Sequence, residues 1–505
     1  MEVTRTLFIA LILIFAVSAD EYHPSIEIKG ALRRKSFVSV ENEWNEAQKI
    51  LKNQESQSTN KNTAKNLILF IGAGLSIVTS AATRVYMGGE EVQLGYEQFP
   101  YFGLSKTYCV DKQVADSASA ATALLSGIKT NFGVVGLSAN VNTSQCTYGN
   151  HDVANSIIKW AQDAGKSTGF VTTARVTDAT VAAAYAHSPN KNWENDQAIP
   201  TACRNQIKDI ADQLVNSEEG KKLNVILGGG RQNFITTATT DDEGTRGYRQ
   251  DGRNLINEWM TSRSKSGSPK YIWNKSQLDS INTATTDYLL GLFEADHCMY
   301  NLDIISQGKQ STEPSLSDMT KTAVNVLKKN TNGYVLIVEA GRIDHANQKN
   351  LARRALDETA ELSKAVDLAK SMTNSDDTLI VATGDHANVM TISGYSSTHN
   401  DILKYSNIIP VAYDRMPFET LTYANGPAYS KTYGPTGRND ITNDNFADIN
   451  RQYSATVPLA SSTNGGEDTG VYSSGPWSHL LTGSFEQNEI PVAMAYAAKI
   501  GPFKK

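Results

Sequence analysis

The chain has 505 residues, of which 40% are hydrophobic, and this is enough to bury a large core. Its net charge of −6 comes without a basic stripe, which argues against nucleic acid as a partner. Four cysteines are too few for a fold held together by disulfides.

Residues 1–19 have the features of a secretory signal peptide. One base, Arg5, precedes an apolar run over residues 7–17, and small residues follow up to Ala19. The run is too short to span a membrane as a helix. The other end of the chain has no hydrophobic tail that a lipid anchor could replace. We therefore predict a secreted, extracellular protein with no membrane anchor, and the sequons at Asn142 and Asn274 predict glycosylation.

Residues 20–64 are polar and predict an N-terminal arm with one helix, because apolar side chains recur at helical spacing only around Trp44 and Ile50. From residue 65 onward, short apolar runs alternate with helical patterns. Strands are expected at residues 67–71, 169–173, 224–227, 334–338 and 378–383, and helices at residues 153–164, 319–329 and 352–372. This alternation predicts an α/β fold, with a large doubly wound, mostly parallel sheet flanked by helices.

Regular patterning weakens between residues 393 and 469, where Asn, Tyr, Ser, Gly and Pro are frequent. We expect a loop-rich crown inserted on the main sheet, within one domain that spans residues 65–505. No internal repeat is visible.

Polar side chains gather where several predicted strands end. The segments concerned are residues 114–120, 175–180, 338–345 and 383–386. One such segment alone is typical of a capped helix, since Asp and Ser are favoured N-caps. In a doubly wound sheet, however, chemistry occurs beyond the carboxyl ends of the strands. The four segments together therefore predict an active site.

These segments resemble those of the alkaline phosphatase family, and the resemblance runs from residue 67 to about residue 497. It extends to residues 106–108 (KTY), 131–133 (NFG), 185–187 (YAH), 192–193 (NW), 227–231 (LGGGR), 291–294 (GLFE) and 465–468 (GGED). The resemblance implies a homodimeric α/β enzyme. In that family two zinc ions and a magnesium ion support hydrolysis of phosphate monoesters through a phosphoserine.

The residues that would handle phosphate are largely present. The resemblance makes Ser117 the nucleophile, and Asp116 would orient the side chain that clamps the phosphate. That side chain is an arginine in the family, but Lys191 stands in its place. Lysine keeps the charge and loses the planar fork that binds two oxygens at once.

Several metal-site positions also match. Asp385 and His386 match ligands of the zinc ion that activates the nucleophile, and Asp344 matches a ligand of the zinc ion at the leaving group. The matches at the magnesium site are Thr180, Glu339 and, behind the ligands, Asp178.

Three ligand positions are substituted. Ala73 replaces an aspartate that would bridge zinc and magnesium, and Gln348 and Asn464 replace two histidines of the leaving-group zinc site. Asn388 also replaces a histidine behind the ligands. Zinc prefers imidazole, thiolate or carboxylate to an amide. We therefore expect an impaired or inactive phosphatase with sub-stoichiometric metal, and the alternatives are a working phosphatase acting through Ser117 and a purely binding role.

Two further features follow from the resemblance. Cys146 and Cys203 align with a family disulfide. Glu294 and Glu313, with the Phe293 carbonyl, correspond to a calcium site in vertebrate relatives. Ordinary surface carboxylates are the alternative there.

Overall fold

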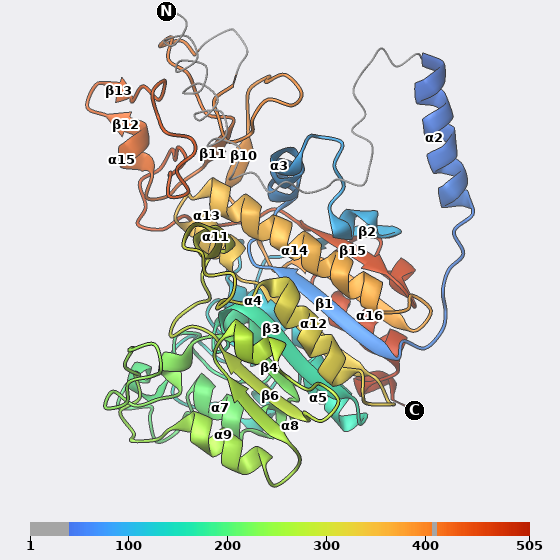
Figure 1. Ribbon diagram of the computed structural model, residues 1–505, viewed down its shortest axis with the longest axis vertical. Helices are drawn as coiled ribbons and strands as arrows, with labels where there is room; N and C mark the ends of the chain where they lie inside the picture. The colour runs from blue at the N-terminus through green and yellow to red at the C-terminus, as the bar shows by residue number, and fades with distance from the viewer. Residues whose placement is uncertain (1–39, 407–411, 505) are drawn as a thin grey trace, which may run out of the picture.

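The computed structural model describes residues 40–406 and 412–504, and a ten-stranded sheet forms its centre (Figure 1). Every neighbouring pair of strands is parallel except the two pairs made by β15. The expected mostly parallel sheet is confirmed. In spatial order the strands are β16 (Gly483–Glu486), β2 (Tyr101–Lys106), β15 (Thr469–Ser474), β8 (Thr378–Gly384), β1 (Asn66–Gly72), β7 (Tyr334–Ala340), β3 (Ser167–Arg175), β4 (Val225–Gly229), β6 (Tyr288–Leu292) and β5 (Pro269–Ile272).

Helices cover both faces of this sheet, because alternate side chains of a strand point to opposite faces. Leu67 and Leu69 of β1 pack in one core with α4 (Ser117–Ser126), α5 (Ile157–Asp163) and α16 (Glu489–Ala498). Ile68 and Phe70 pack in a second core with α12 (Leu316–Leu327) and α14 (Ala352–Met372), which run alongside β1 in Figure 1. A strand buried on both faces explains the continuous apolar run that the sequence shows.

Smaller elements surround this framework. Further α-helices are α3 (Ile77–Met87), α6 (Ala179–Ala182), α7 (Ile210–Asn216), α8 (Glu218–Lys222), α9 (Leu255–Arg263), α10 (Lys275–Asp279), α11 (Asn301–Ser306), α13 (Arg342–Gln348) and α15 (Tyr429–Thr432). In the described part of the crown the strands are short, namely β10 (Met390–Ile392), β11 (Leu421–Tyr423), β12 (Tyr433–Gly434), β13 (Gly437–Arg438) and β14 (Asn464–Gly465).

The expected helix over residues 153–164 begins later than its apolar pattern suggests. The side chain of Ser156 accepts a hydrogen bond from the backbone N–H of Lys159, so α5 starts at Ile157. Val153 instead forms an isolated bridge with Leu137. The apolar side chain of Val153 therefore packs against Leu137, outside the helix, although it fits the helical pattern of the sequence.

Helix α2 (Val40–Glu55) is the helix expected in the N-terminal arm, and it stands away from the sheet (Figure 1). Its apolar side chains are exposed: Trp44 to 64% and Leu51 to 62%. The expected signal peptide lies outside the described residues. Within those residues, no helix combines the length and the apolar character that crossing a membrane requires.

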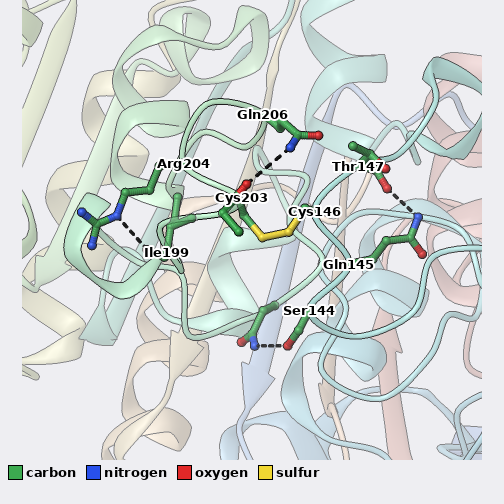
Figure 2. The surroundings of a disulfide bond; sticks show 10 residues. Ser144, Gln145, Cys146, Thr147, Ile199, Cys203, Arg204 and Gln206 are labelled. Carbon is green, nitrogen blue, oxygen red and sulfur yellow. Dashed lines mark hydrogen bonds between the residues drawn. A yellow bond between two sulfur atoms is a disulfide. The ribbon is translucent and has the colours of Figure 1, made fainter.

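The expected disulfide is present between Cys146 and Cys203, whose Cα atoms are 4.8 Å apart (Figure 2). The other two cysteines, Cys109 and Cys298, are buried free thiols.

Of the two sequons, Asn142 is exposed, whereas the side-chain oxygen of Asn274 caps α10 by accepting the N–H of Gln277.

Candidate active site

Four neighbouring strands bring the candidate residues together at one edge of the sheet. In the order β8, β1, β7, β3, these strands run parallel, and Gly72 at the end of β1 lies opposite both Gly384 and Ala340. The segments that follow the strands therefore start side by side. This arrangement explains how residues far apart in the sequence form one site.

A pocket of about 270 Å³ opens at this edge, and we call it the serine pocket. Its lining is mainly polar and includes most of the residues identified from the sequence. Those residues are Ala73, Ser117, Asp178, Thr180, Lys191, Glu339, Asp344 and Gln348.

Ser117 is the first residue of α4, and its hydroxyl contacts a buried histidine side chain. Its Oγ lies 3.1 Å from Nε2 of His386, which is fully buried. Nδ1 of the same ring lies 2.9 Å from the carbonyl oxygen of Ala387, which can only accept. In the neutral ring the proton is therefore on Nδ1, and the lone pair on Nε2 can accept the serine hydroxyl or bind a metal ion.

Asp385 has one oxygen that fits a cation. Its Oδ1 accepts the backbone N–H groups of Gly74, at 2.9 Å, and of His386, at 2.8 Å. Its Oδ2 is buried and has no hydrogen-bond partner among the described residues. A buried carboxylate oxygen without a partner is costly unless a cation or proton satisfies it. Asp385 and His386 therefore suit one divalent ion.

Lys191 and Asp116 form an ion pair beside the serine, with 2.9 Å between Nζ and Oδ2. Asp116 also caps α4, and its Oδ1 accepts the N–H of Gly133 at 3.0 Å. Burial opposes ionisation of this carboxyl, but Lys191 and the N–H donors hold its pKa below the usual range. The pair fixes an ammonium group at the position expected to contact phosphate.

At the position where the resemblance places the leaving-group zinc ion, two side chains of α13 form a hydrogen bond with each other. Asp344 and Gln348 are four residues apart, so they share one face of the helix. Nε2 of Gln348 donates to Oδ2 of Asp344 at 2.6 Å. Burial raises the pKa of Asp344 to about 6. An amide N–H that points at the carboxylate cannot serve as a metal ligand, so these residues do not fit a zinc ion.

The two asparagines in place of family histidines make structural hydrogen bonds. Asn464, in β14 (Asn464–Gly465), lies opposite Asn388, in β9 (Ala387–Asn388). Nδ2 of Asn464 donates to the carbonyl of Ala115 at 2.8 Å, and Nδ2 of Asn388 donates to that of Gly74 at 2.7 Å. Both amide groups therefore hold loops of the site in place.

The residues expected at the magnesium site lie together in the serine pocket. Glu339 accepts a hydrogen bond from Thr172 at 2.5 Å. Burial, together with the nearby charge of Asp178, raises the pKa of Glu339 to about 8. A buried carboxylate with a raised pKa gains from a cation, but Ala73 supplies no second carboxylate to share that ion.

The carboxylates expected at a calcium site influence one another. Burial, with the charges of Glu294 and Glu243, raises the pKa of Glu313 to about 7. Burial and Glu243 likewise raise the pKa of Glu294. Sequence reasoning identified Glu294 and Glu313 but missed Glu243, which lies in a loop far from both in the chain. Glu313 is buried, Glu294 is half-buried, and Glu243 is exposed and pairs with Arg231 at 2.9 Å.

Three further lining residues of the serine pocket escaped the sequence analysis as site residues: Arg175, Glu194 and His297. Arg175 Nε and Nη2 each donate to Glu194 at 2.8 Å. His297 follows the expected motif at residues 291–294 by only three positions. Arg175 begins the polar segment 175–180, so the sequence marked its position without a role, whereas no pattern marks Glu194 or His297, whose proximity comes from the packing of separate strands.

Comparisons with known proteins identify the family of this chain. The alkaline phosphatase family model matches residues 64–500. The membrane-bound alkaline phosphatase of Bombyx mori is 41% identical over 504 residues, which cover 96% of this chain and 90% of that protein. The tissue-nonspecific isozyme of Gallus gallus is 44% identical over 460 residues, which cover 88% and 86%. The chain therefore belongs to the alkaline phosphatase family.

Solved structures show the same fold at lower identity. The Thermus thermophilus alkaline phosphatase has a TM-score of 0.61 at 22% identity and covers 88% of this chain and 93% of its own. A mutant of the TAB5 alkaline phosphatase, described with Mg bound in its M3 site, has a TM-score of 0.60 at 21% identity and covers 87% and 99%. Both confirm the expected fold class.

Proposed function

We propose that this chain is a phosphatase homologue that binds phosphate groups in the serine pocket but hydrolyses phosphate monoesters slowly or not at all. The observation that carries the proposal is the 2.6 Å hydrogen bond from Gln348 to Asp344. It gives the leaving-group position an N–H donor where a zinc ion needs a lone pair. Of the three ligands expected there, only the carboxylate of Asp344 remains.

Ala73 and Asn464 support the same conclusion. Ala73 has no ligand atom, and it lies at the wall where a bridging carboxylate would hold two ions. Asn464 uses its Nδ2 to bond the carbonyl of Ala115. Zinc supplies the charge that stabilises a leaving alkoxide, so without the second ion the leaving group depends on solvent for its proton.

Phosphate binding has support from the residues that remain. The ammonium of Lys191 is held beside Asp116, and the hydroxyl of Ser117 opens into the same pocket. Lysine binds phosphate as a point charge, and it lacks the two parallel N–H donors of arginine. We expect phosphate to bind weakly and mainly through this charge.

The second candidate is a working phosphatase that uses fewer metal ions. The contact of 3.1 Å between Ser117 Oγ and His386 Nε2 favours it, since a serine needs a base or a metal ion to become a nucleophile. Asp385 and His386 also keep a lone pair and an unpartnered carboxylate oxygen for one ion.

A steady-state assay on an aryl phosphate at alkaline pH, with zinc and magnesium supplied, separates the two candidates. We expect a turnover number far below the ~1–1000 per second of ordinary enzymes. Ser117→Ala is the test variant, and Ser306→Ala, an exposed serine on α11, is the matched control. An ordinary rate that survives in Ser306→Ala and disappears in Ser117→Ala contradicts the impairment.

We also propose that the protein is a secreted, glycosylated homodimer, and that Glu294 and Glu313, with the Phe293 carbonyl, bind calcium. The signal-peptide pattern, the disulfide and the exposed sequon at Asn142 support secretion. The exposed apolar stripe of α2 supports a dimer, because a partner subunit would bury it. Light scattering of the purified protein and calcium-dependent thermal stability test the last two points.

A further inference from the structure

Two histidines and an aspartate stand together in one wall of the serine pocket. Asp178 caps α6, His297 follows β6, and His345 belongs to α13. Oδ2 of Asp178 lies 3.9 Å from Nδ1 of His297 and 4.0 Å from Nε2 of His345. One ligand atom from each residue lies within 4.8 Å of the other two. Three separate segments of the chain thus converge on one point.

These distances are close to those of a bound zinc ion. With bonds of about 2.0–2.1 Å, the ligand atoms around a tetrahedral zinc ion are about 3.3 Å apart. The two measured separations need to shrink by about 0.6–0.7 Å. Small side-chain rotations provide that movement, because all three residues are only partly buried.

The two histidine rings lie side by side. The ring centroids of His297 and His345 are 4.0 Å apart, so both rings border the same space next to Asp178. A metal ion takes the lone pair of one nitrogen of a neutral imidazole, and the other nitrogen then carries the ring proton.

Two arginines face the cluster and limit its affinity. Nη1 of Arg175 lies 2.7 Å from Nε2 of His297, and Nη1 of Arg342 lies 3.3 Å from Nδ1 of His345. The charge of Arg175 is already shared with Glu194, at 2.8 Å, and with Asp296, at 2.6 Å. Arg175 also contacts two candidate ligand atoms: its backbone N–H donates to Nδ1 of His297 at 3.2 Å, and its Nη2 lies 3.4 Å from Oδ2 of Asp178. A cation must therefore displace these two contacts as well as the two arginine–histidine contacts.

We propose that Asp178, His297 and His345 bind a zinc ion in the wall of the serine pocket. Two imidazoles, one carboxylate and an open fourth position form a ligand set found in zinc sites that bind water or substrate. All three residues line the pocket that Ser117 and Lys191 also line. The site uses none of the expected zinc ligands Asp344, Asp385 and His386; it shares only Asp178 with the expected magnesium site, where that residue stands behind the ligands. The inference does not depend on the proposed loss of hydrolysis.

Zinc stoichiometry of the whole mature protein tests this site. Protein stripped with a chelator is dialysed against micromolar zinc, and bound metal is measured by mass spectrometry and titration calorimetry. We expect His297→Ala and His345→Ala each to lower the stoichiometry by one zinc ion. His386→Ala and the exposed-surface control His151→Ala should keep that ion.

A second variant and a spectroscopic measurement separate loss of the zinc site from loss of the fold. His297→Gln preserves the size of the side chain in case the alanine variant unfolds. Cobalt(II) in place of zinc should give visible absorption typical of a four-coordinate site, and this absorption should vanish in His297→Gln. The proposal is overturned if no zinc binds, or if His386→Ala loses the ion while His297→Gln retains it. Hydrolysis is not measured, so this result and the activity assay fail independently.

Discussion

Restoring three metal ligands should turn this chain back into a phosphatase. The perturbation is the triple change Ala73→Asp, Gln348→His and Asn464→His. It supplies the missing bridging carboxylate and replaces the two amide groups with imidazoles. Each single change should recover little, because residues that act as a unit are strongly non-additive.

The structure sets the size of the stability change that accompanies this repair. Ala73 is 3% exposed, and the site already holds Glu339 and Asp344, whose pKa values burial raises to about 8 and about 6. A further buried carboxylate without a counter-ion should cost about 3–5 kcal/mol. Zinc at about 1,000 times its dissociation constant should stabilise the folded protein by about 4 kcal/mol. Ala73→Asp should therefore destabilise the metal-free protein, and zinc should offset the loss only in the triple variant.

Two assays follow this prediction. Urea unfolding with a chelator or with zinc measures the stability change, and hydrolysis of an aryl phosphate measures the repair. Ala73→Asn is the matched control, since it has the size of aspartate without the charge. Adding Lys191→Arg should raise the rate about 10-fold more through a two-point clamp on the transition state. The reasoning is refuted if the triple variant binds two zinc ions tightly and stays inert.

Further predictions concern processing, the disulfide and pH. Mass spectrometry of the secreted product should show a chain that starts near residue 20 with glycan at Asn142 or Asn274; an intact first residue contradicts this. Replacing Cys146 and Cys203 by serine opens a 57-residue loop and should cost about 4 kcal/mol in urea unfolding, and an unchanged midpoint would contradict the estimate. Burial raises the pKa of Glu358 to about 8, so the folded state loses stability as pH rises from about 4.5 to 8. Glu358→Gln keeps the acceptor for the backbone N–H that this side chain binds, and should raise the melting temperature at pH 9 more than at pH 5; equal shifts would refute this.

Local sequence patterns determined the elements of the central sheet. Continuous apolar runs such as residues 67–71 predicted buried parallel strands, because a strand covered on both faces needs no polar alternation. The end of α14 at Met372 and the start of β8 at Thr378 agree with the pattern. The antiparallel strand β15 was not predicted, since its pairing with β2 and β8 depends on segments far away in the chain.

The sequence also determined which chemical groups the site contains and which it lacks. Ser117, Asp385 and Gln348 could be identified because a motif fixes a residue relative to the end of its own strand. Only the tertiary structure decided what those groups contact. It placed the amide of Gln348 on Asp344, and it brought His297 beside Asp178 through β6 and β3, two strands that do not pair directly. Such contacts depend on how strands and helices pack, and no local spacing encodes that packing.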